Sequence, residues 1–228
     1  MTVDTISISL DVFSQMALDE ALLVFSPNES LTLRFYSWAG PAATFGRHQS
    51  FRFIEQELEK AGKPRLSRAR RITGGGLVFH EGDLTFSLTF PWVDFISPAE
   101  IYQRLHHLIA HEIAKEGVFL DLKPEPPATP GLNKICFSMP EKSDLMTPSG
   151  KKILGGALCR KNRRGLYQGS LQAPLTPLPL PQIEQAIYRA TALFGDREPE
   201  QKADFISPQE LHSLVEKYHS DKWQLRIP

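Results

Sequence analysis

Hydrophobic and polar positions alternate along this chain with two different periods, which separate expected helices from expected strands. Apolar residues recur at helical spacing over 12–25, directly behind Asp11, and this predicts a first helix with an aspartate N-cap. Alternation with a period of two predicts half-buried strands at 31–36 and 84–90. The chain therefore begins with a helix and then enters a β-sheet.

Capping and turn signals place the other elements. Residues 97–100 (Ser-Pro-Ala-Glu) form a capping box with proline at the first helical position, and the apolar stripe behind it continues until Gly117. A similar box opens a helix expected near 208–219, and four prolines make 124–131 a loop or lid. The remaining expected elements are strands at 42–46, 66–70, 76–80, 134–139, 143–147, 151–160 and 165–172, and helices near 52–61 and 182–194. Together they predict an α+β fold, in which mixed β-sheets are flanked by helices.

Composition narrows the class of protein. Lys plus Arg and Asp plus Glu both total 26, so no overall field draws the 228-residue chain to nucleic acid or to an anionic membrane. No apolar run approaches the roughly 20 residues of a membrane helix, and Asp4 stands where a signal peptide is basic. Cys136 and Cys159 are too few for a disulfide framework and lack metal-type spacing. We expect a cytoplasmic protein without a metal site.

Residues 70–80 (Arg-Arg-Ile-Thr-Gly-Gly-Gly-Leu-Val-Phe-His) join two cations to three glycines between two expected strands. Glycine lets a backbone press against a ligand and aim N–H groups at phosphate oxygens, which arginines neutralise. The segment lacks the Gly-Lys-Ser ending of a P-loop, and a strand rather than a helix follows it, unlike a dinucleotide fingerprint. Taken alone, it is more typical of a glycine-rich hairpin than of a phosphate site.

Residues 150–157 (Gly-Lys-Lys-Ile-Leu-Gly-Gly-Ala) repeat this theme, because lysines precede small residues on an expected strand. A lysine there can act as a point charge on a carboxylate or phosphate. Alone, the pair of lysines is more typical of a solvated hairpin corner.

Five segments in order give the chain a family resemblance. They are 16–22 (Met-Ala-Leu-Asp-Glu-Ala-Leu), 33–38 (Leu-Arg-Phe-Tyr-Ser-Trp), 45–50 (Phe-Gly-Arg-His-Gln-Ser), 70–80 and 152–157 (Lys-Ile-Leu-Gly-Gly-Ala). On these, the chain resembles the lipoate-protein ligase and octanoyltransferase family, whose catalytic domain is similar to biotin-protein ligase. The resemblance implies a catalytic domain over 1–175 and a short helical extension over 176–228, packed on it, without a large accessory domain.

The resemblance implies a lipoate-protein ligase-like enzyme that attaches a lipoyl or octanoyl group to a lysine of a carrier domain, through an acyl-adenylate made from ATP with magnesium. Lys152 matches the family's catalytic lysine and would stabilise developing negative charge. No tightly bound cofactor is expected. The other residues expected to surround the acyl-adenylate are Arg47, Arg70, Arg71, Gly74, Gly75, Gly76, Val78, Phe79, His80, Gly155, Gly156 and Ala157. Lys151 is a further phosphate candidate, and Phe35, Trp38, Val78 and Phe79 are candidates for the acyl slot.

The implied partners are lipoyl carrier domains of 2-oxoacid dehydrogenase complexes or the glycine cleavage H protein. Acyl carrier protein or an accessory subunit are further candidates, because many ligases carry a C-terminal accessory domain that is not expected here. Gln168 also departs from the family, which often has histidine before this glycine. An amide cannot act as a base there.

One branch of the family needs no ATP and takes octanoyl from acyl carrier protein through a cysteine thioester, and Cys136-Phe137 resembles that branch. Cys136 would then be the nucleophile, activated by Lys152. The alternative for Cys136 is a small buried apolar residue. Residues 46–49 and the uninterrupted glycines are closer to the ligase versions, and we therefore favour ligation.

The histidines and the family resemblance raise two other classes of protein as alternatives. His106, His107 and His111 share one expected helix, but Leu108 stands where a zinc hydrolase needs glutamate after His107, which excludes that class. A non-catalytic module that binds lipoate or a lipoyl domain is the second alternative. The presence of Lys152 and Arg71 argues against it.

Overall fold

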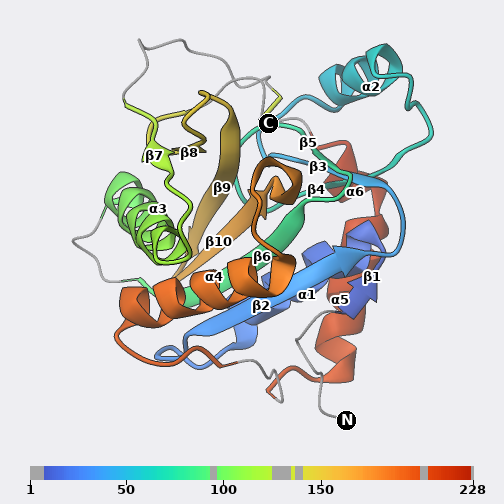
Figure 1. Cartoon of the computed structure of the whole chain (residues 1–228). Coiled ribbons are helices and arrows are strands. Elements are labelled where there is room, and N and C mark those ends of the chain that lie inside the picture. The colour runs from blue at the N-terminus through green and yellow to red at the C-terminus, as the bar shows by residue number, and fades with distance from the viewer. Residues whose placement is uncertain (1–7, 93–96, 125–134, 137–140, 201–204, 227–228) are drawn as a thin grey trace.

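The computed structural model describes residues 8–92, 97–124, 135–136, 141–200 and 205–226 (Figure 1). Two β-sheets form its centre: a seven-stranded sheet ordered β1-β2-β6-β10-β9-β8-β7 and a three-stranded sheet ordered β4-β3-β5. The strands are β1 (Ile8–Leu10), β2 (Thr32–Trp38), β3 (Ala42–Phe45), β4 (Ser67–Arg70), β5 (Val78–His80), β6 (Leu84–Pro91), β7 (Asp121–Leu122), β8 (Leu145–Met146), β9 (Lys152–Lys161) and β10 (Arg164–Leu171). β1 is parallel to β2 and β3 to β4, whereas the other paired strands are antiparallel. The prediction of mixed sheets in an α+β fold is confirmed.

The helices begin where the capping signals predict. Asp11 accepts hydrogen bonds from the backbone N–H groups of Phe13 and Ser14 at 2.9 and 3.1 Å, which caps the first helix. Both Ser-Pro-x-Glu segments form complete capping boxes. The helices are α1 (Val12–Phe25), α2 (Phe51–Lys60), α3 (Pro98–Ala114), α4 (Leu180–Gly195), α5 (Pro208–His219) and α6 (Asp221–Gln224), with a 3₁₀ turn at Ala173–Leu175.

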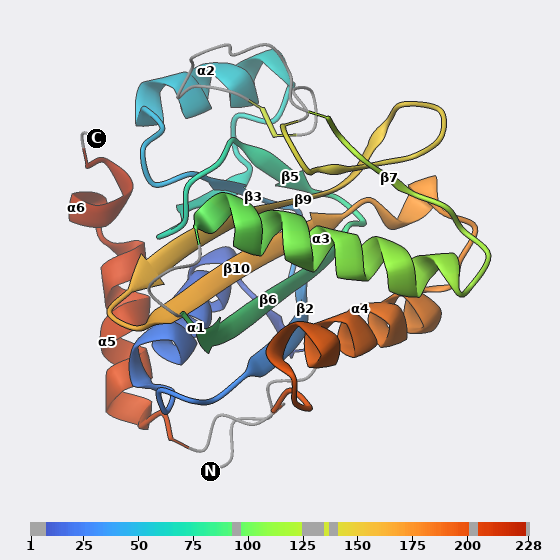
Figure 2. The same cartoon turned by 90° about the vertical axis from the view of Figure 1, so that its left-hand side faces the viewer.

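The helices cover the sheets in layers. α3 and α4 lie across one face of the large sheet and pack on each other, and their apolar stripes meet strands β2, β6, β9 and β10 in the main core (Figure 2). α1 packs on the other face with α5 behind it, and it also contacts β3 and β4 of the small sheet. A smaller core lies between α2 and the small sheet. The space between the two sheets is therefore bordered by α1.

Three short elements were not predicted: β1, β7 and α6, each of two to four residues. Segments this short carry too few positions for a periodic signal. The predicted loop at 124–131 and the predicted strand at 134–139 fall mostly outside the described residues. Of that strand, Ile135 forms an isolated parallel bridge with Leu77, and the Cys136 N–H donates to the Leu77 carbonyl at 2.8 Å.

The glycine-rich segment does not form a hairpin. β4 and β5 lie on opposite sides of β3, which provides backbone partners to both, so the chain between them must cross the end of β3. The crossing is held by the Arg71 N–H, which donates to the Phe45 carbonyl at 2.8 Å, and by the Arg47 N–H, which donates to the Thr73 carbonyl at 2.8 Å. This glycine crossover thus faces the strands of the large sheet.

Candidate functional site

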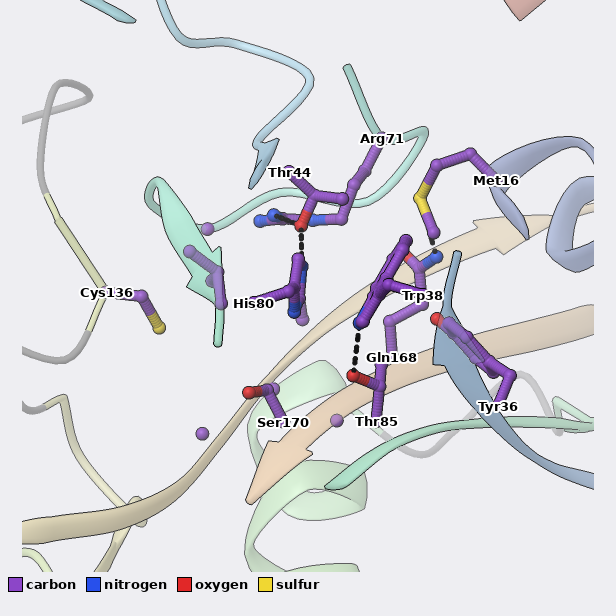
Figure 3. A pocket seen from close by; sticks show the side chains of 16 residues that line it. Met16, Tyr36, Trp38, Thr44, Arg71, His80, Thr85, Cys136, Gln168 and Ser170 are labelled. Carbon is purple, nitrogen blue, oxygen red and sulfur yellow. Dashed lines mark hydrogen bonds between the residues drawn. The ribbon is translucent and has the colours of Figure 1, made fainter. Parts of the chain in front are cut away.

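A pocket lies between the two sheets, where the glycine crossover faces β9 and β10 (Figure 3). The cavity itself has a volume of about 30 Å³, and it opens to solvent. Its walls come from α1, β2, β3, the crossover, β5, β6, β9, β10 and the short segment at Cys136. The lining residues are Met16, Tyr36, Trp38, Thr44, Arg71, Gly75, Val78, His80, Thr85, Cys136, Gly155, Gly156, Ala157, Gln168, Gly169 and Ser170. Segments 16–22, 33–38, 70–80 and 152–157 of the sequence each contribute to this one pocket.

Backbone geometry explains two of the glycines. A Cβ on Gly46 would lie 2.0 Å from the carbonyl oxygen of Gly75, so a side chain at Gly46 would displace the crossover. Gly75 itself has φ +85°, a left-handed conformation that glycine adopts at low cost. Gly74 has open space around it. The crossover can therefore lie against the end of β3 because Gly46 lacks a side chain and because Gly75 can adopt a left-handed conformation.

Arg71 holds the crossover in shape from inside. Its guanidinium donates to the carbonyls of Gly74 and Gly76, both at 2.9 Å, and to the hydroxyls of Thr44 and Thr73 at 2.8 and 3.3 Å. Burial lowers its pKa to about 10, so it still carries its charge at neutral pH. Arg71 therefore brings a fixed cation to the pocket wall while most of its donors are occupied.

The polar groups of the pocket wall bind one another, which leaves apolar surface facing the pocket. Trp38 stacks on His80 with ring centroids 4.1 Å apart, and its indole N–H donates to Thr85 at 3.1 Å. The two ring nitrogens of His80 lie 2.8 Å from the Thr44 hydroxyl and 2.9 Å from the Asp83 carboxylate. Hydrogen-bonded polar groups can line an apolar ligand at little cost. The surface that faces the pocket is therefore largely apolar.

Lys152 and Cys136 meet at the edge of this pocket. The Lys152 Nζ donates to the Cys136 carbonyl at 3.1 Å and lies 3.2 Å from its Sγ. The lysine stem runs over Gly155, where a Cβ would lie only 2.4 Å from the Lys152 Cε. Glycine at this position of β9 thus makes room for the lysine that faces the thiol.

Asp144 is the third member of this cluster. Its Oδ2 lies 2.7 Å from the Lys152 Nζ, and both side chains are almost fully buried, with 1% and 2% exposed. Tyr102 donates its hydroxyl to Asp144 Oδ1 at 2.5 Å and accepts from the Gly156 N–H at 2.8 Å. Burial lowers the pKa of Lys152, but the opposing charges of Cys136 and Asp144 outweigh it and the pKa is raised. Lys152 is a cation at neutral pH.

Residues 11–183 match the lipoyl protein ligase A/B catalytic domain family, which spans most of the chain and every wall of the pocket. The chain belongs to this family. Its relatives include the octanoyltransferase LipM of Oceanobacillus iheyensis, 33% identical over 168 residues, and LipM of Moorella thermoacetica, 29% identical over 170 residues. Each match covers 71% of this chain, and the chain spans about 60% of the length of these curated relatives.

Solved structures of the family share the fold. A lipoate protein ligase of T. acidophilum with bound lipoic acid superposes with a TM-score of 0.75 over 96% of this chain and 97% of that one, at 18% identity. A lipoate-protein ligase A bound with ATP gives 0.72 over 96% and 97% of the two chains, at 19% identity. The predicted family and its catalytic-domain fold are therefore confirmed.

The structure brings together most of the residues that the sequence singled out. Lys152 adjoins the pocket through Cys136 and Gly155, and Gly74 and Gly76 flank the lining Gly75. The predicted residues that line the pocket are Arg71, Gly75, Val78, His80, Cys136, Gly155, Gly156, Ala157 and, from the acyl-slot candidates, Trp38. Arg47 and Lys151 are exposed and do not line the pocket.

Arg70 does not face the pocket, which corrects the expectation that it meets phosphate. Its guanidinium is buried and donates to the backbone carbonyls of Arg47, Gln49, Gln224 and Arg226 at 2.8–3.2 Å. Those bonds occupy all five donors of an arginine. Arg70 instead binds the chain after α5 to the strand that leads into the crossover.

Phe79 and Phe35 also face away from the pocket. Side chains on a strand alternate between its two faces, so Val78 and His80 point into the pocket while Phe79 packs in the smaller core beneath α2. Phe35 lies in the main core, 6.1 Å from Phe86 between ring centroids. The acyl-slot expectation for these two phenylalanines is wrong.

Gln168, the departure from the family pattern, joins two walls of the pocket. Its Oε1 accepts from the Thr73 hydroxyl at 2.6 Å, and its Nε2 donates to Asp19 at 2.7 Å. Asp19 also accepts from Arg34 and Ser87, both at 2.6 Å. The amide thus links the crossover to α1 without adding an ionisable group.

Sequence reasoning missed Asp144 and Tyr102. Tyr102 belongs to the apolar stripe of α3, and nothing in its spacing separates it from an ordinary core residue. Asp144 lies eight positions before Lys152, in a segment that was expected only to be a strand. A carboxylate within a short apolar segment was the available signal, because a buried charge needs a partner.

Proposed function

We propose that this chain is an octanoyltransferase that works without ATP, with Cys136 as the nucleophile that carries the acyl group. The observation that carries the proposal is the Cys136 sulfur, which lines the pocket 3.2 Å from the Lys152 ammonium. A nearby cation favours thiolate over thiol, and the thiolate is the nucleophilic form. LipM octanoyltransferases among the relatives support the same reading.

The reaction has two steps. The Cys136 thiolate attacks the thioester carbonyl of an octanoyl donor such as octanoyl-acyl carrier protein, and the donor thiol leaves, so one thioester replaces another. The amine of a carrier lysine then attacks the Cys136 thioester; the new amide forms, the carbon–sulfur bond breaks, and the amine proton passes to the departing thiolate. Lys152 stabilises the negative oxygen that develops in both steps.

ATP-dependent lipoate ligation is the competing reading, and it is the one the sequence favoured. It requires cations for the phosphates. Of the five candidates, Arg70 has all its donors on backbone carbonyls and Arg71 has most of its donors on the crossover and its threonines. Lys152 is paired with Asp144, which leaves Arg47 and Lys151 at the surface. This arrangement favours transfer over adenylation.

The acceptor in this proposal is a lysine on a lipoyl carrier domain of a 2-oxoacid dehydrogenase complex or on the glycine cleavage H protein. Each half of the proposal can be tested by the mass of a purified apo carrier domain. Octanoyl-acyl carrier protein without ATP should add one octanoyl group. If modification instead needs lipoate or octanoate with ATP and magnesium, ligation replaces transfer. If neither donor supports modification although the carrier binds tightly, the chain is a binding module.

A further inference from the structure

The Cys136 sulfur changes its charge during the proposed reaction, whereas Lys152 has to remain a cation throughout. In the free enzyme the ammonium donates a hydrogen bond to this sulfur at 3.2 Å. Once the sulfur carries an acyl group it is neutral, and a buried ammonium without a counter-ion tends to lose its proton. The second step then lacks the charge that polarises the thioester carbonyl.

We propose that Asp144 is a positioning residue that keeps Lys152 charged and beside the sulfur in the acyl-enzyme. The proposal rests on the proposed function, because it concerns the thioester at Cys136. Asp144 Oδ2 holds the Nζ at 2.7 Å from one side while the Cys136 Sγ lies 3.2 Å from it on another. One partner therefore persists when the other is neutralised.

The carboxylate is itself held in place. Its Oδ1 accepts from the Tyr102 hydroxyl at 2.5 Å and its Oδ2 from the Glu141 N–H at 2.6 Å. On the next turn of α3, His106 contacts the Ser143 carbonyl at 2.7 Å, which fixes the backbone beside Asp144. Together with the ion pair to the Lys152 Nζ, these bonds fix the place of both carboxylate oxygens. Asp144 is thus held in position beside the amine.

Among the described residues, four further ionisable groups near the amine and the sulfur carry no negative charge near pH 7. They are Arg71 after β4, Tyr102 and His106 on α3, and Tyr167 on β10. Burial raises the pKa of both tyrosines well above the usual value and lowers that of His106 to about 4, so all three are neutral near pH 7. Arg71 is a second cation.

The main test separates the two half-reactions in Asp144→Asn, which keeps the side-chain shape and removes the charge. The Cys136 sulfur still accepts a hydrogen bond from Lys152 before acylation, so thioester formation should continue. Release of the acyl group to the carrier lysine should slow by at least about tenfold, less than the roughly 100-fold cost of losing an oxyanion donor outright, because Lys152 itself stays in place. Intact mass should therefore show octanoyl-enzyme accumulating. Equal slowing of both half-reactions would overturn the proposal.

A second measurement tests the same charge without any acyl donor, so it stands even if the octanoyltransferase proposal fails. In Asp144→Asn the Lys152 ammonium no longer shares its charge with a carboxylate, and alkylation of Cys136 by iodoacetamide at pH 7 should speed up by about tenfold. An unchanged or slower rate would contradict the coupling.

Two controls separate charge from loosened packing. Tyr102→Phe removes a hydrogen bond from the same carboxylate but no charge, so Cys136 alkylation should stay within about twofold of wild type. Cys159 on β9 reports opening of the strand that carries Lys152, because burial raises the pKa of its thiol to about 12. Faster alkylation of Cys159 in Asp144→Asn, or an equal increase in Tyr102→Phe, would assign Asp144 a purely structural role and overturn the proposal.

Discussion

The Gly46 Cα lies so close to the Gly75 carbonyl that a Cβ on Gly46 would stand 2.0 Å from that oxygen. This contact sets the glycine crossover against the end of β3 and opens the pocket on its other side. The pocket is lined there by Gly75, Arg71 and the strand β9, and the Cys136 sulfur also faces it. The site is therefore assembled by backbone approach as much as by its reactive side chains.

Gly46→Ala should destabilise the protein. The methyl group cannot be accommodated without shifting the crossover, and we expect a loss of about 2 kcal/mol or more in the free energy of unfolding. Gly74→Ala is the matched control, because a Cβ there meets nothing within 4 Å. It should stay within about 0.5 kcal/mol of wild type in urea denaturation. Equal stabilities for the two variants would show that the close approach does not form.

Arg70→Lys should also destabilise, because Arg70 binds backbone carbonyls rather than substrate. A lysine cannot reach four carbonyls on two sides, and leaving buried acceptors unpaired should cost about 2–3 kcal/mol. Arg47→Lys, at an exposed neighbouring position, should change stability by less than about 0.5 kcal/mol. Denaturation curves for both variants decide the matter. If Arg70→Lys is as stable as wild type, Arg70 does not depend on these backbone bonds and is again a candidate for binding phosphate.

Trp38→Ala should lengthen the acyl chain that the proposed enzyme accepts. Trp38 and Tyr36 lie on the opposite side of the pocket from Cys136, so an acyl chain held at the sulfur would run toward them (Figure 3). We expect kcat/KM for dodecanoyl relative to octanoyl donors to rise about tenfold or more. Phe79→Leu, on the other face of the small sheet, should leave that ratio unchanged. No change in the Trp38 variant would remove Trp38 from the acyl end of the pocket.

His106 makes stability depend on pH. Burial lowers its pKa to about 4, and its ring nitrogens contact the Ser143 carbonyl and the Tyr167 hydroxyl. Unfolding restores an ordinary pKa near 6.5, so the unfolded chain binds the extra proton between about pH 6.5 and 4. Stability should therefore fall by up to about 3 kcal/mol as the pH is lowered through that window.

The measurement is urea denaturation at several pH values between 4 and 7. His106→Gln should flatten this part of the pH dependence, although it lowers stability at pH 7. His107→Gln, at an exposed position of the same helix, should leave the dependence as in wild type. A wild-type slope that persists in His106→Gln would assign the effect to other groups.

The periodic and capping signals were sufficient for much of the fold. The capping boxes at Ser97 and Ser207 predicted where two helices begin, since a proline at the first helical position and a glutamate two residues later leave few alternatives. The order of the strands within each sheet could not be predicted from the sequence. β3 separates β4 from β5, and this pairing over a distance along the chain is what turns an expected glycine hairpin into a crossover.

The candidate site was predictable where several segments matched one family and was missed where one buried residue acts through another. Arg70 and Arg71 are adjacent and chemically identical, yet Arg70 ends β4 and binds backbone carbonyls, whereas Arg71 begins the crossover and faces the pocket. Strand alternation could have separated Phe79 from its neighbours on β5. Asp144 and Tyr102 depend on tertiary contacts between α3 and β9, which no local pattern contains.

The described residues also include no helix long and apolar enough to cross a bilayer.

The central claim is that Cys136 carries the acyl group, and the acyl-enzyme itself tests it most directly. The protein is mixed with octanoyl-acyl carrier protein in the absence of ATP and of any acceptor, and its intact mass and peptide masses are measured. We predict one octanoyl group on Cys136 that hydroxylamine removes, and none on Cys136→Ser or on Cys159 in either protein. The account would be contradicted by two results together. The first is that no octanoyl adduct forms on the protein. The second is that the wild type and Cys136→Ser modify an apo lipoyl domain equally well with lipoate, ATP and magnesium.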